Sequence, residues 1–321
     1  MKKRIFSLVI AATLIVNLCP VAFASNIDHN TLILQEINVP LEIIDIMPEE
    51  DINKIVTAYL NNPDSISIST STLTVDVVSE MKSFSNMSDQ ELLSAGYSPS
   101  QISQGRQIIE YYINSSDSEL LSTGLSLSEI SHLRRALTAA EDAVLPYDLI
   151  APTKLTFTQI AYNLSSVHPN YDVHIYFNWE SPYFCDAFND KIVIAWGGGL
   201  KQSEVYQHIR YHISSPIASD FGDYLCEADA TYSEVTVDAM GIYTFPQSRT
   251  QILTGCAKSG SITYNISQPE FTGRNSKAIA YYAHQTFMLT GSIQFSGTSL
   301  SPSISIGSGY DTIFTQSDIR V

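Results

Sequence analysis

The second half of the chain alternates apolar and polar side chains with a period of two. Residues 173–177 show this alternation, and residues 192–196 repeat it. The same period recurs in five later segments, which Gly, Pro, Asn and Ser separate: 205–213, 231–245, 261–267, 277–290 and 292–306. A period of two is that of a half-buried strand. Several such strands, without long helical patterns between them, are typical of an antiparallel sandwich. We therefore expect an antiparallel β-sandwich domain over residues 152–321.

The first half carries an internal repeat of helical character. Residues 88–103 and 116–131 match at 11 of 16 positions, with a spacing of 28 residues. Each copy begins with a capping box, in which a serine hydroxyl and a glutamate satisfy the first helical amides: Ser88 with Glu91, and Ser116 with Glu119. A glycine that suits a left-handed helix end follows each short helix, and then a second cap begins the next helix: Gly96 before Ser98 and Gln101, and Gly124 before Ser126 and Glu129.

The repeat predicts two stacked helical hairpins over residues 86–148, each of which covers the apolar face of the other. Such a unit is either an interaction module or a compact scaffold without a ligand of its own. The preceding residues 25–85 form a mixed N-terminal region, with a helix that begins at Pro48 and a strand over residues 66–78. The expected fold class is α+β: an N-terminal helical region with two helical-hairpin repeats, followed by the antiparallel β-sandwich.

The amino terminus has the form of a bacterial export signal. A basic start precedes a mainly apolar run over residues 5–18. A small-x-small site then predicts cleavage between Ala24 and Ser25, so that residues 1–24 are a signal peptide. The run is too short for a stable membrane span, which needs about 20 apolar residues. A lipoprotein cut before Cys19 and a retained amino-terminal anchor are the alternatives. The expected location is secreted, extracellular or cell-wall associated.

The charge of the chain narrows the choice of partners. The net charge is −16, and removal of residues 1–24 leaves 14 basic against 33 acidic residues. Nucleic acid is excluded as a partner, because phosphate binding needs clustered Lys and Arg. Attraction to an anionic membrane by charge alone is excluded for the same reason. The acidity indicates solubility, and no cofactor is expected. Calcium is the lesser alternative, because a loose acidic run between Asp220 and Asp238 offers oxygen ligands without the spacing of a calcium loop.

Three cysteines follow the predicted cleavage site: Cys185, Cys226 and Cys256. Export permits a disulfide, but an odd number leaves at least one of them free or paired with another chain. The sequence does not choose among the three internal pairings. Zinc and redox chemistry have no support, because the chain contains no CxxC pair.

The sequence contains no catalytic motif that we can identify. It lacks a GxSxG elbow and a cysteine-protease context. His208 and His212 lack the intervening glutamate of a zinc-protease helix. On a strand they would lie about 13 Å apart, too far to share one ion. Carboxylate pairs for sugar hydrolysis need no linear signature, so a secreted hydrolase that acts on wall polymer or carbohydrate is an alternative function.

Two features of the β-rich half could serve binding. Trp196, Tyr281 and Tyr282 are candidate surface-binding aromatics, although aromatic residues of a sandwich are more often in the core. Residues 290–312 alternate small polar and apolar residues, a pattern shared by membrane-inserting hairpins and by edge hairpins of soluble sandwiches. Pro302 favours an edge strand or a bulge. A membrane-active β-hairpin protein is therefore a second alternative.

The β-rich half also resembles a group of uncharacterised secreted proteins from Gram-positive, spore-forming bacteria. The residues that carry the resemblance run from Phe177-Asn178-Trp179 and Pro182 through Asp190 and Ile192 to Trp196. A second stretch runs from Ala280 to Asp311 and includes Tyr282, His284 and Gly309-Tyr310-Asp311-Thr312. The resemblance spans about residues 170–315, and it implies export and the β domain. It implies no reaction, no cofactor and no site residue.

Taken together, these features predict a secreted or cell-envelope interaction protein without catalytic activity. Its ligand would belong to the cell envelope or be another extracellular molecule. A membrane is not the expected partner.

Overall fold

The computed structural model describes residues 29–122, 127–139, 153–180, 189–213, 226–228, 231–234, 239–246, 248–250, 254–285, 293–298, 301–306 and 310–320. The predicted cleavage site between Ala24 and Ser25 lies outside these residues, as do Gly124, Cys185 and most of the acidic run between Asp220 and Asp238.

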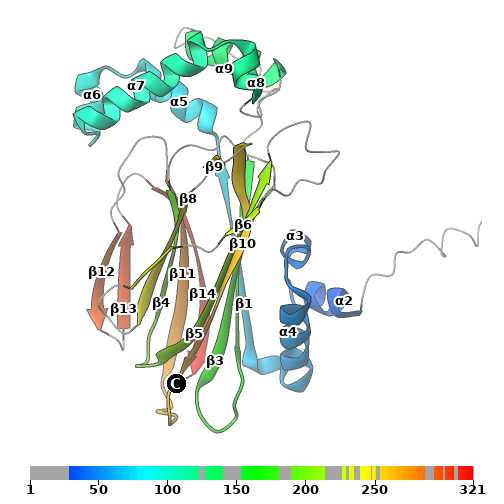
Figure 1. Ribbon diagram of the computed structural model, residues 1–321. Helices are drawn as coiled ribbons and strands as arrows, with labels where there is room; N and C mark the ends of the chain where they lie inside the picture. The colour runs from blue at the N-terminus through cyan, green and yellow to red at the C-terminus, as the bar shows by residue number, and fades with distance from the viewer. Residues whose placement is uncertain are drawn as a thin grey trace, which may run out of the picture.

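Two antiparallel sheets make up the body of the protein (Figure 1). The larger sheet has the order β1-β2-β3-β10-β5-β6, with β9 paired to β10, which gives seven strands within the described residues. Its strands are β1 (Ile66–Val75), β2 (Thr153–Asn163), β3 (Asn170–Trp179), β5 (Lys201–Ile213), β6 (Cys226–Ala228), β9 (Ser248–Thr250) and β10 (Thr254–Ser267). The second sheet has the order β14-β11-β4-β8-β7 over the same part of the chain. Its strands are β4 (Asn189–Trp196), β7 (Thr231–Glu234), β8 (Met240–Pro246), β11 (Asn275–Gln285) and β14 (Tyr310–Arg320).

The inner faces of the two sheets share one apolar core. Phe177 of the larger sheet stacks on Phe245 of the other sheet, with ring centroids 5.4 Å apart. Tyr264 and Trp196 make a similar contact between the sheets at 5.5 Å. The alternation that predicts the strands therefore selects the side chains of this core. The expected combination of helices with antiparallel sheets is confirmed.

Strand β1 belongs to the larger sheet, although it lies in the part of the chain that was expected to precede the β domain. All ten residues of β1 pair with β2, from Ile66 opposite Tyr162 to Val75 opposite Thr153. The domain boundary predicted at residue 152 is therefore wrong for this strand. The strand expected over residues 66–78 is present over residues 66–75, and a helix begins at Val77. Its partner β2 begins 78 positions after Val75, and no local sequence pattern predicts such a pairing.

Three helices ahead of β1 cover part of the outer face of the larger sheet: α2 (His29–Glu36), α3 (Leu41–Ile44) and α4 (Glu49–Asn61). The short helix η2 (Pro63–Ser65) joins α4 to β1. The buried Ile55 and Val56 of α4 share an apolar cluster with Ile160, Tyr162 and Tyr176 of the sheet. The predicted helix start at Pro48, followed by three acids in the first turn, is confirmed.

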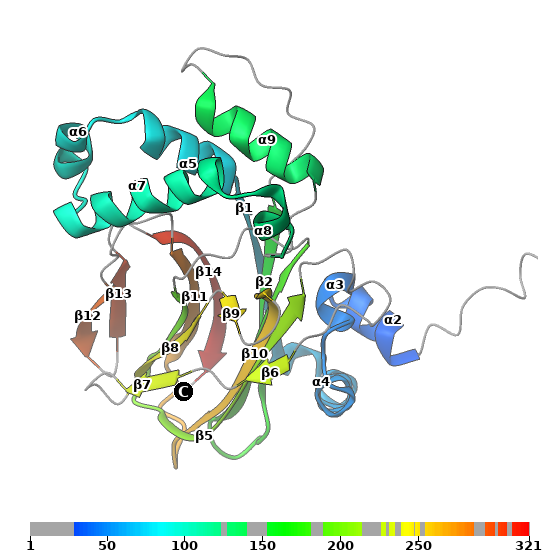
Figure 2. The ribbon, with the colours of Figure 1, turned by 45° about the horizontal axis from the view of Figure 1, so that its top comes forward.

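The chain between β1 and β2 contains a second helical unit with its own apolar core. It comprises α5 (Val77–Asn86), α6 (Asp89–Ser94), α7 (Pro99–Asn114), α8 (Asp117–Ser122) and α9 (Leu127–Thr138). Figure 2 shows these helices gathered at one end of the two sheets. The capping boxes predicted at Ser88 and Ser98 are both present. Gly96 has the predicted left-handed conformation, with a φ of 101°.

Two arginines make equivalent contacts in this unit. Arg106 of α7 donates to the end of α5 and the start of α6: the carbonyl oxygens of Phe84, Ser85 and Met87 and the carboxylate of Asp89. Arg134 of α9 makes a corresponding set of contacts at the junction of α7 and α8: the carbonyl oxygens of Tyr112 and Ser115 and the carboxylate of Asp117. Each guanidinium thus satisfies carbonyl groups that a helix end leaves without an intrahelical partner.

The serine-rich stretch near the carboxyl terminus forms a two-stranded sheet of its own. Strands β12 (Ile293–Thr298) and β13 (Ser301–Ile306) pair with each other, and Gly297 lies opposite Pro302. Strand β13 contacts β4, so the hairpin lies against the second sheet (Figure 1).

Two of the three cysteines lie in the larger sheet. Cys226 pairs with Tyr211 and Cys256 with His212, on opposite sides of β5. Two strand spacings, about 10 Å, separate the two cysteine backbones, whereas a disulfide needs Cα atoms within about 7 Å.

Candidate ligand-binding cavity

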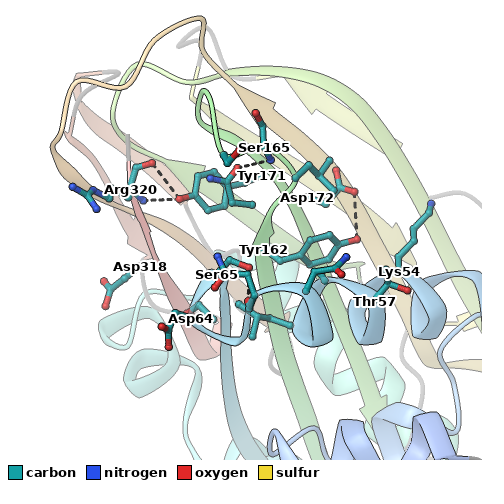
Figure 3. Close-up of a pocket in the computed structure, with 18 of the residues that line it drawn as sticks. Lys54, Thr57, Asp64, Ser65, Tyr162, Ser165, Tyr171, Asp172, Asp318 and Arg320 are labelled. Carbon is teal, nitrogen blue, oxygen red and sulfur yellow. Dashed lines mark hydrogen bonds between the residues drawn. The ribbon is translucent and has the colours of Figure 1, made fainter.

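An open cavity of about 1310 Å³ lies at the end of the sheets away from helices α5–α9. Four parts of the chain line it: helix α4 with the start of β1, the β2–β3 hairpin, the loop between β10 and β11, and the end of β14. Its volume exceeds that of most small-molecule pockets. Figure 3 labels lining residues of three of these parts: α4 with the start of β1, the β2–β3 hairpin and the end of β14.

Helix α4 contributes a polar wall to the cavity. The lining residues Glu50, Asn53, Lys54, Thr57 and Asn61 follow helical spacing and therefore share one face of α4. The opposite face packs on the sheet, so the same amphipathic pattern fixes the helix and turns these side chains outward. Lys54 lies 2.7 Å from Glu50, whose hydrogen bond raises the pKa of the ammonium group. Asn53 accepts a hydrogen bond from Asn30 of α2.

Two tyrosines form the inner part of the cavity in fixed positions (Figure 3). The Tyr171 hydroxyl donates to the backbone oxygen of Arg320 at 3.1 Å and accepts from its backbone nitrogen at 2.9 Å. The Tyr162 hydroxyl donates to Asp172 at 3.4 Å. Burial raises the pKa of both phenols, and the charge of Asp172 raises that of Tyr162 further. Both hydroxyls therefore stay protonated at neutral pH and keep these hydrogen bonds.

A buried aromatic stack lies directly behind Tyr162. The ring of His174 lies between Tyr162 and Tyr176, with centroid distances of 5.5 and 6.2 Å. Asp51 of α4 closes the stack, because it accepts from the Tyr176 hydroxyl at 2.7 Å and lies 3.5 Å from Nδ1 of His174. Burial raises the pKa of Asp51. The hydrogen bond and charge of His174, together with the hydrogen bond of Tyr176, outweigh burial and leave the pKa of Asp51 lowered. This cluster holds α4, and with it one wall of the cavity, on the sheet.

The lining mixes amides, hydroxyls, carboxylates and aromatic faces. Asn61, Asn62, Ser165 and Ser166 add neutral donors and acceptors, and Phe271 adds an exposed ring. Four carboxylates face two cations: Glu50, Asp64, Asp172 and Asp318 against Lys54 and Arg320. Such a lining offers many hydrogen bonds of both polarities and an excess of negative charge. It suits a polar ligand that carries little or no negative charge.

A second polar cluster lies in the core at the opposite end of the sheets. Asp190 is fully buried and accepts hydrogen bonds from the Tyr282 hydroxyl at 2.6 Å and from the Gln285 backbone at 3.1 Å. Nδ1 of His284 lies 3.1 Å from the same carboxylate. Burial lowers the pKa of His284, but the charge and hydrogen bond of Asp190, helped by Glu80 and Asp311, raise it overall. This cluster therefore holds the strands β4 and β11 together at this end.

The structure corrects two of the three candidate surface aromatics. Trp196 and Tyr282 have exposed fractions of 1% and 0%, because both lie on the inward face of their strands. Their polar atoms bond inside the protein, Trp196 to the backbone oxygen of Leu200 and Tyr282 to Asp190. Tyr281 points outward instead, and its ring lies 5.5 Å from that of Phe314. The period of two identifies two faces of a strand but does not say which one is buried.

The cavity residues were not identified from the sequence. They come from four segments that are far apart in the chain, so no local spacing marks them. The one available signal was the polar face of α4, which repeats at helical spacing opposite the apolar face that packs on the sheet. Other considered sites fall elsewhere: His208 lies on β5 opposite Ser261, and Glu227 and Glu234 lie on β6 and β7.

Comparisons with known proteins give little further information. The chain matches no protein-family model, and no curated protein matches it. Among solved structures, the collagen-binding domain of the Erysipelothrix rhusiopathiae surface protein RspB has a TM-score of 0.24 and 10% identity over 51% of this chain and 66% of that chain. The collagen adhesin of S. aureus has a TM-score of 0.24 and 8% identity, over 53% and 66%. The pilus backbone RrgB of Streptococcus pneumoniae has 0.21 and 6%, over 49% and 44%.

These TM-scores and identities are too low to define a shared fold or function. The matched region also spans no more than 66% of each of these three chains. Within the residues that the structure describes, no helix is both long and apolar enough to cross a membrane.

Proposed function

We propose that this protein is a secreted or cell-envelope interaction protein that binds an extracellular ligand in the cavity between α4 and the end of β14 without altering it chemically. The observation that carries the proposal is the cavity itself. Its two inner tyrosines are held by hydrogen bonds to Arg320 and Asp172, and its α4 wall is anchored through Asp51. A lining whose geometry is fixed before binding loses little conformational entropy when the ligand arrives.

The export signal supports an extracellular location, in the manner of the Gram-positive secreted proteins that the β domain resembles. In this proposal the two sheets act as a β-sandwich that presents the cavity. Helices α6–α9 are two copies of one helical-hairpin repeat, supported by the equivalent contacts of Arg106 and Arg134. The ligand belongs to the cell envelope or to another extracellular surface.

A sedimentation experiment tests this function. Purified protein that begins at Ser25 is mixed separately with whole Gram-positive cells, purified cell wall and liposomes, and each mixture is centrifuged. We expect the protein to sediment with cells and wall and to stay in solution with liposomes. Thr57→Trp places a large ring in the cavity and should abolish sedimentation. Leu60→Trp is the matched control, because Leu60 is 62% exposed on the same helix and does not line the cavity.

Three results would contradict the proposal. Equal sedimentation of the Thr57→Trp and Leu60→Trp variants would show that the cavity does not bind the ligand. Release of soluble sugar from the wall by the wild-type protein would favour the hydrolase instead. Leakage from liposomes would favour the membrane-active hairpin protein.

A further inference from the structure

We infer that the ligand is a linear, uncharged polysaccharide that lies along the outer face of β14, with one end in the cavity. This inference rests on the proposed function, because it names the chemical class that the cavity would bind. It extends the site from the cavity to a second surface, the aromatic pair Tyr281 and Phe314.

Strand β14 links the two surfaces. Its side chains alternate between the core and solvent, and the exposed series is Thr312, Phe314, Gln316, Asp318 and Arg320. Asp318 and Arg320 are part of the cavity lining, whereas Phe314 belongs to the aromatic pair. Arg320 lies six positions after Phe314, which corresponds to about 20 Å along a strand. A single extended molecule can therefore contact both surfaces, whereas a monosaccharide cannot.

The aromatic pair offers an apolar platform. Phe314 is 52% exposed, and its ring lies 5.5 Å from that of Tyr281 at an interplanar angle of 30°. Two neighbouring rings packed at this distance and tilt form one continuous apolar patch on the outer face of the strands. The C–H faces of a sugar ring are also flat and apolar, so they can pack on such a surface while the hydroxyl groups stay in water. Gln316 is the next residue of the exposed series on β14. It accepts a hydrogen bond from Lys277 at 3.2 Å and offers polar contacts beside the aromatic pair.

An extended peptide is disfavoured, because the backbone of β14 is already engaged on the side away from β11. The Ser71 hydroxyl donates to the Phe314 carbonyl, and the Gln316 amide donates to Ser69. Tyr171 bonds both backbone groups of Arg320. A peptide that binds by strand addition needs these groups. The ligand must instead be recognised by side chains, which suits a chain of hydroxyl groups and apolar ring faces.

Charge disfavours an anionic polymer. The cavity lining has four carboxylates and two cations, and Lys54 is already paired with Glu50. The whole chain carries a net charge of −16, which repels polyanions at long range. An uncharged glycan meets neither penalty, and the amides and hydroxyls of the lining can bind its hydroxyl groups.

Calorimetric titration of the protein that begins at Ser25 tests the inference. The probes are the hexamers and dimers of β-1,4-linked N-acetylglucosamine and of β-1,4-linked glucose, with hyaluronate as the anionic polymer and polyserine as the peptide. We expect at least one hexamer to bind, its dimer to bind far more weakly, and hyaluronate and polyserine not to bind. Phe314→Ala should weaken hexamer binding about tenfold, a change of roughly 1.4 kcal/mol. Tyr206→Ala, which removes a 67% exposed ring on β5, is the matched control and should leave the affinity unchanged.

Thermal melting of each variant confirms that it is folded. Equal binding of dimer and hexamer, or full affinity of Phe314→Ala, would overturn the inference, as would binding of polyserine in place of the glycans. If neither hexamer binds but the protein still sediments with walls in a manner that Thr57→Trp abolishes, the glycan inference fails and the proposed function stands. If the wild-type protein neither binds hexamers nor sediments with walls or cells, both fail.

Discussion

Ser71 of the first strand donates a hydrogen bond of 2.7 Å to the backbone oxygen of Phe314 on the last strand. The Ser69 hydroxyl of the same strand accepts a hydrogen bond from the Gln316 backbone amide at 3.4 Å. The two residues of each pair lie in different sheets, at the edge where β1 and β14 approach each other. Serine side chains thus satisfy backbone groups that would otherwise offer an open edge for pairing with another chain.

Removal of both hydroxyls should destabilise the protein and open this edge. We expect Ser69→Ala with Ser71→Ala to lower the free energy of unfolding by about 1–3 kcal/mol, since each hydrogen bond contributes roughly 1 kcal/mol. Urea unfolding measures the change. Thr72→Ala is the control, because Thr72 lies on the same strand and faces solvent. An equal loss in the control would show that strand propensity, and not the edge contact, accounts for the effect.

The helical unit should depend on Arg134 and not on its neighbour Arg135. Arg134 binds the end of α7 and Asp117, whereas Arg135 is exposed on the same helix. We expect Arg134→Gln to destabilise the unit by about 1–3 kcal/mol, because charge-assisted hydrogen bonds to helix-end carbonyls are lost. Amide hydrogen exchange measures the change in α7–α9 while the sheets keep their protection. Similar exchange rates in Arg134→Gln and Arg135→Gln would contradict this role.

Much of the local structure could be predicted from the sequence, because its signals are local. The capping boxes at Ser88 and Ser98, the left-handed Gly96 and the alternation in the strands each depend on neighbouring residues. The pairing of β1 with β2 depends on two segments that the helical unit separates. No sequence pattern near Ile66 or Thr153 predicts that these segments pair. The Arg106 and Arg134 contacts could have been found, because the two arginines obey the same spacing of 28 as the visible repeat.

The candidate site was harder to predict for two physical reasons. The cavity forms where α4, the β2–β3 hairpin and the end of β14 meet, so its composition is a product of topology. Trp196 and Tyr282 were candidates for surface binding, with the core as the more usual place for such aromatics, because a large aromatic residue can lie on either face of a strand. Their burial depends on which sheet packs against them, as the contact of Trp196 with Tyr264 shows.

Stability should fall as pH rises above 6.5, the ordinary pKa of histidine, because of His284. The Asp190 carboxylate holds the pKa of this buried histidine above its ordinary value of 6.5, despite the opposing effect of burial. A group whose pKa is raised on folding stabilises the protein fully below its unfolded pKa, and this contribution is lost as pH rises through the folded pKa. We expect the urea midpoint of the wild-type protein to decrease from pH 6 upward through that range. His284→Asn should be less stable at pH 6 and should lack this decrease. A wild-type midpoint that stays level from pH 6 to 9 would contradict the assignment.

Gly260 should tolerate no side chain. It lies on β10, opposite Phe177 on one side and Ile209 on the other. An added Cβ would meet the His208 backbone oxygen and Cε1 of Phe177 at 2.6 Å, and Cδ1 of Ile209 at 2.8 Å. We expect Gly260→Ala to cost about 1–3 kcal/mol or more, the usual cost of overpacking, whereas Ser261→Ala at the next position should have little effect. Thermal and urea unfolding compare the two variants, and equal midpoints would show that the sheet adjusts without strain.

The placement of the helical unit has a consequence for how this chain can change. The unit begins after Val75 and the sheet resumes at Thr153, and these two residues lie opposite each other on neighbouring strands. Entry and exit thus coincide at one point of the framework. Duplication, shortening or wholesale exchange of residues between these two points would leave the strand order intact, and a tight hairpin turn could replace them all. The sheets and the helical unit can therefore change independently in evolution. The sheets keep the architecture, whereas the helical unit is free to acquire new partners.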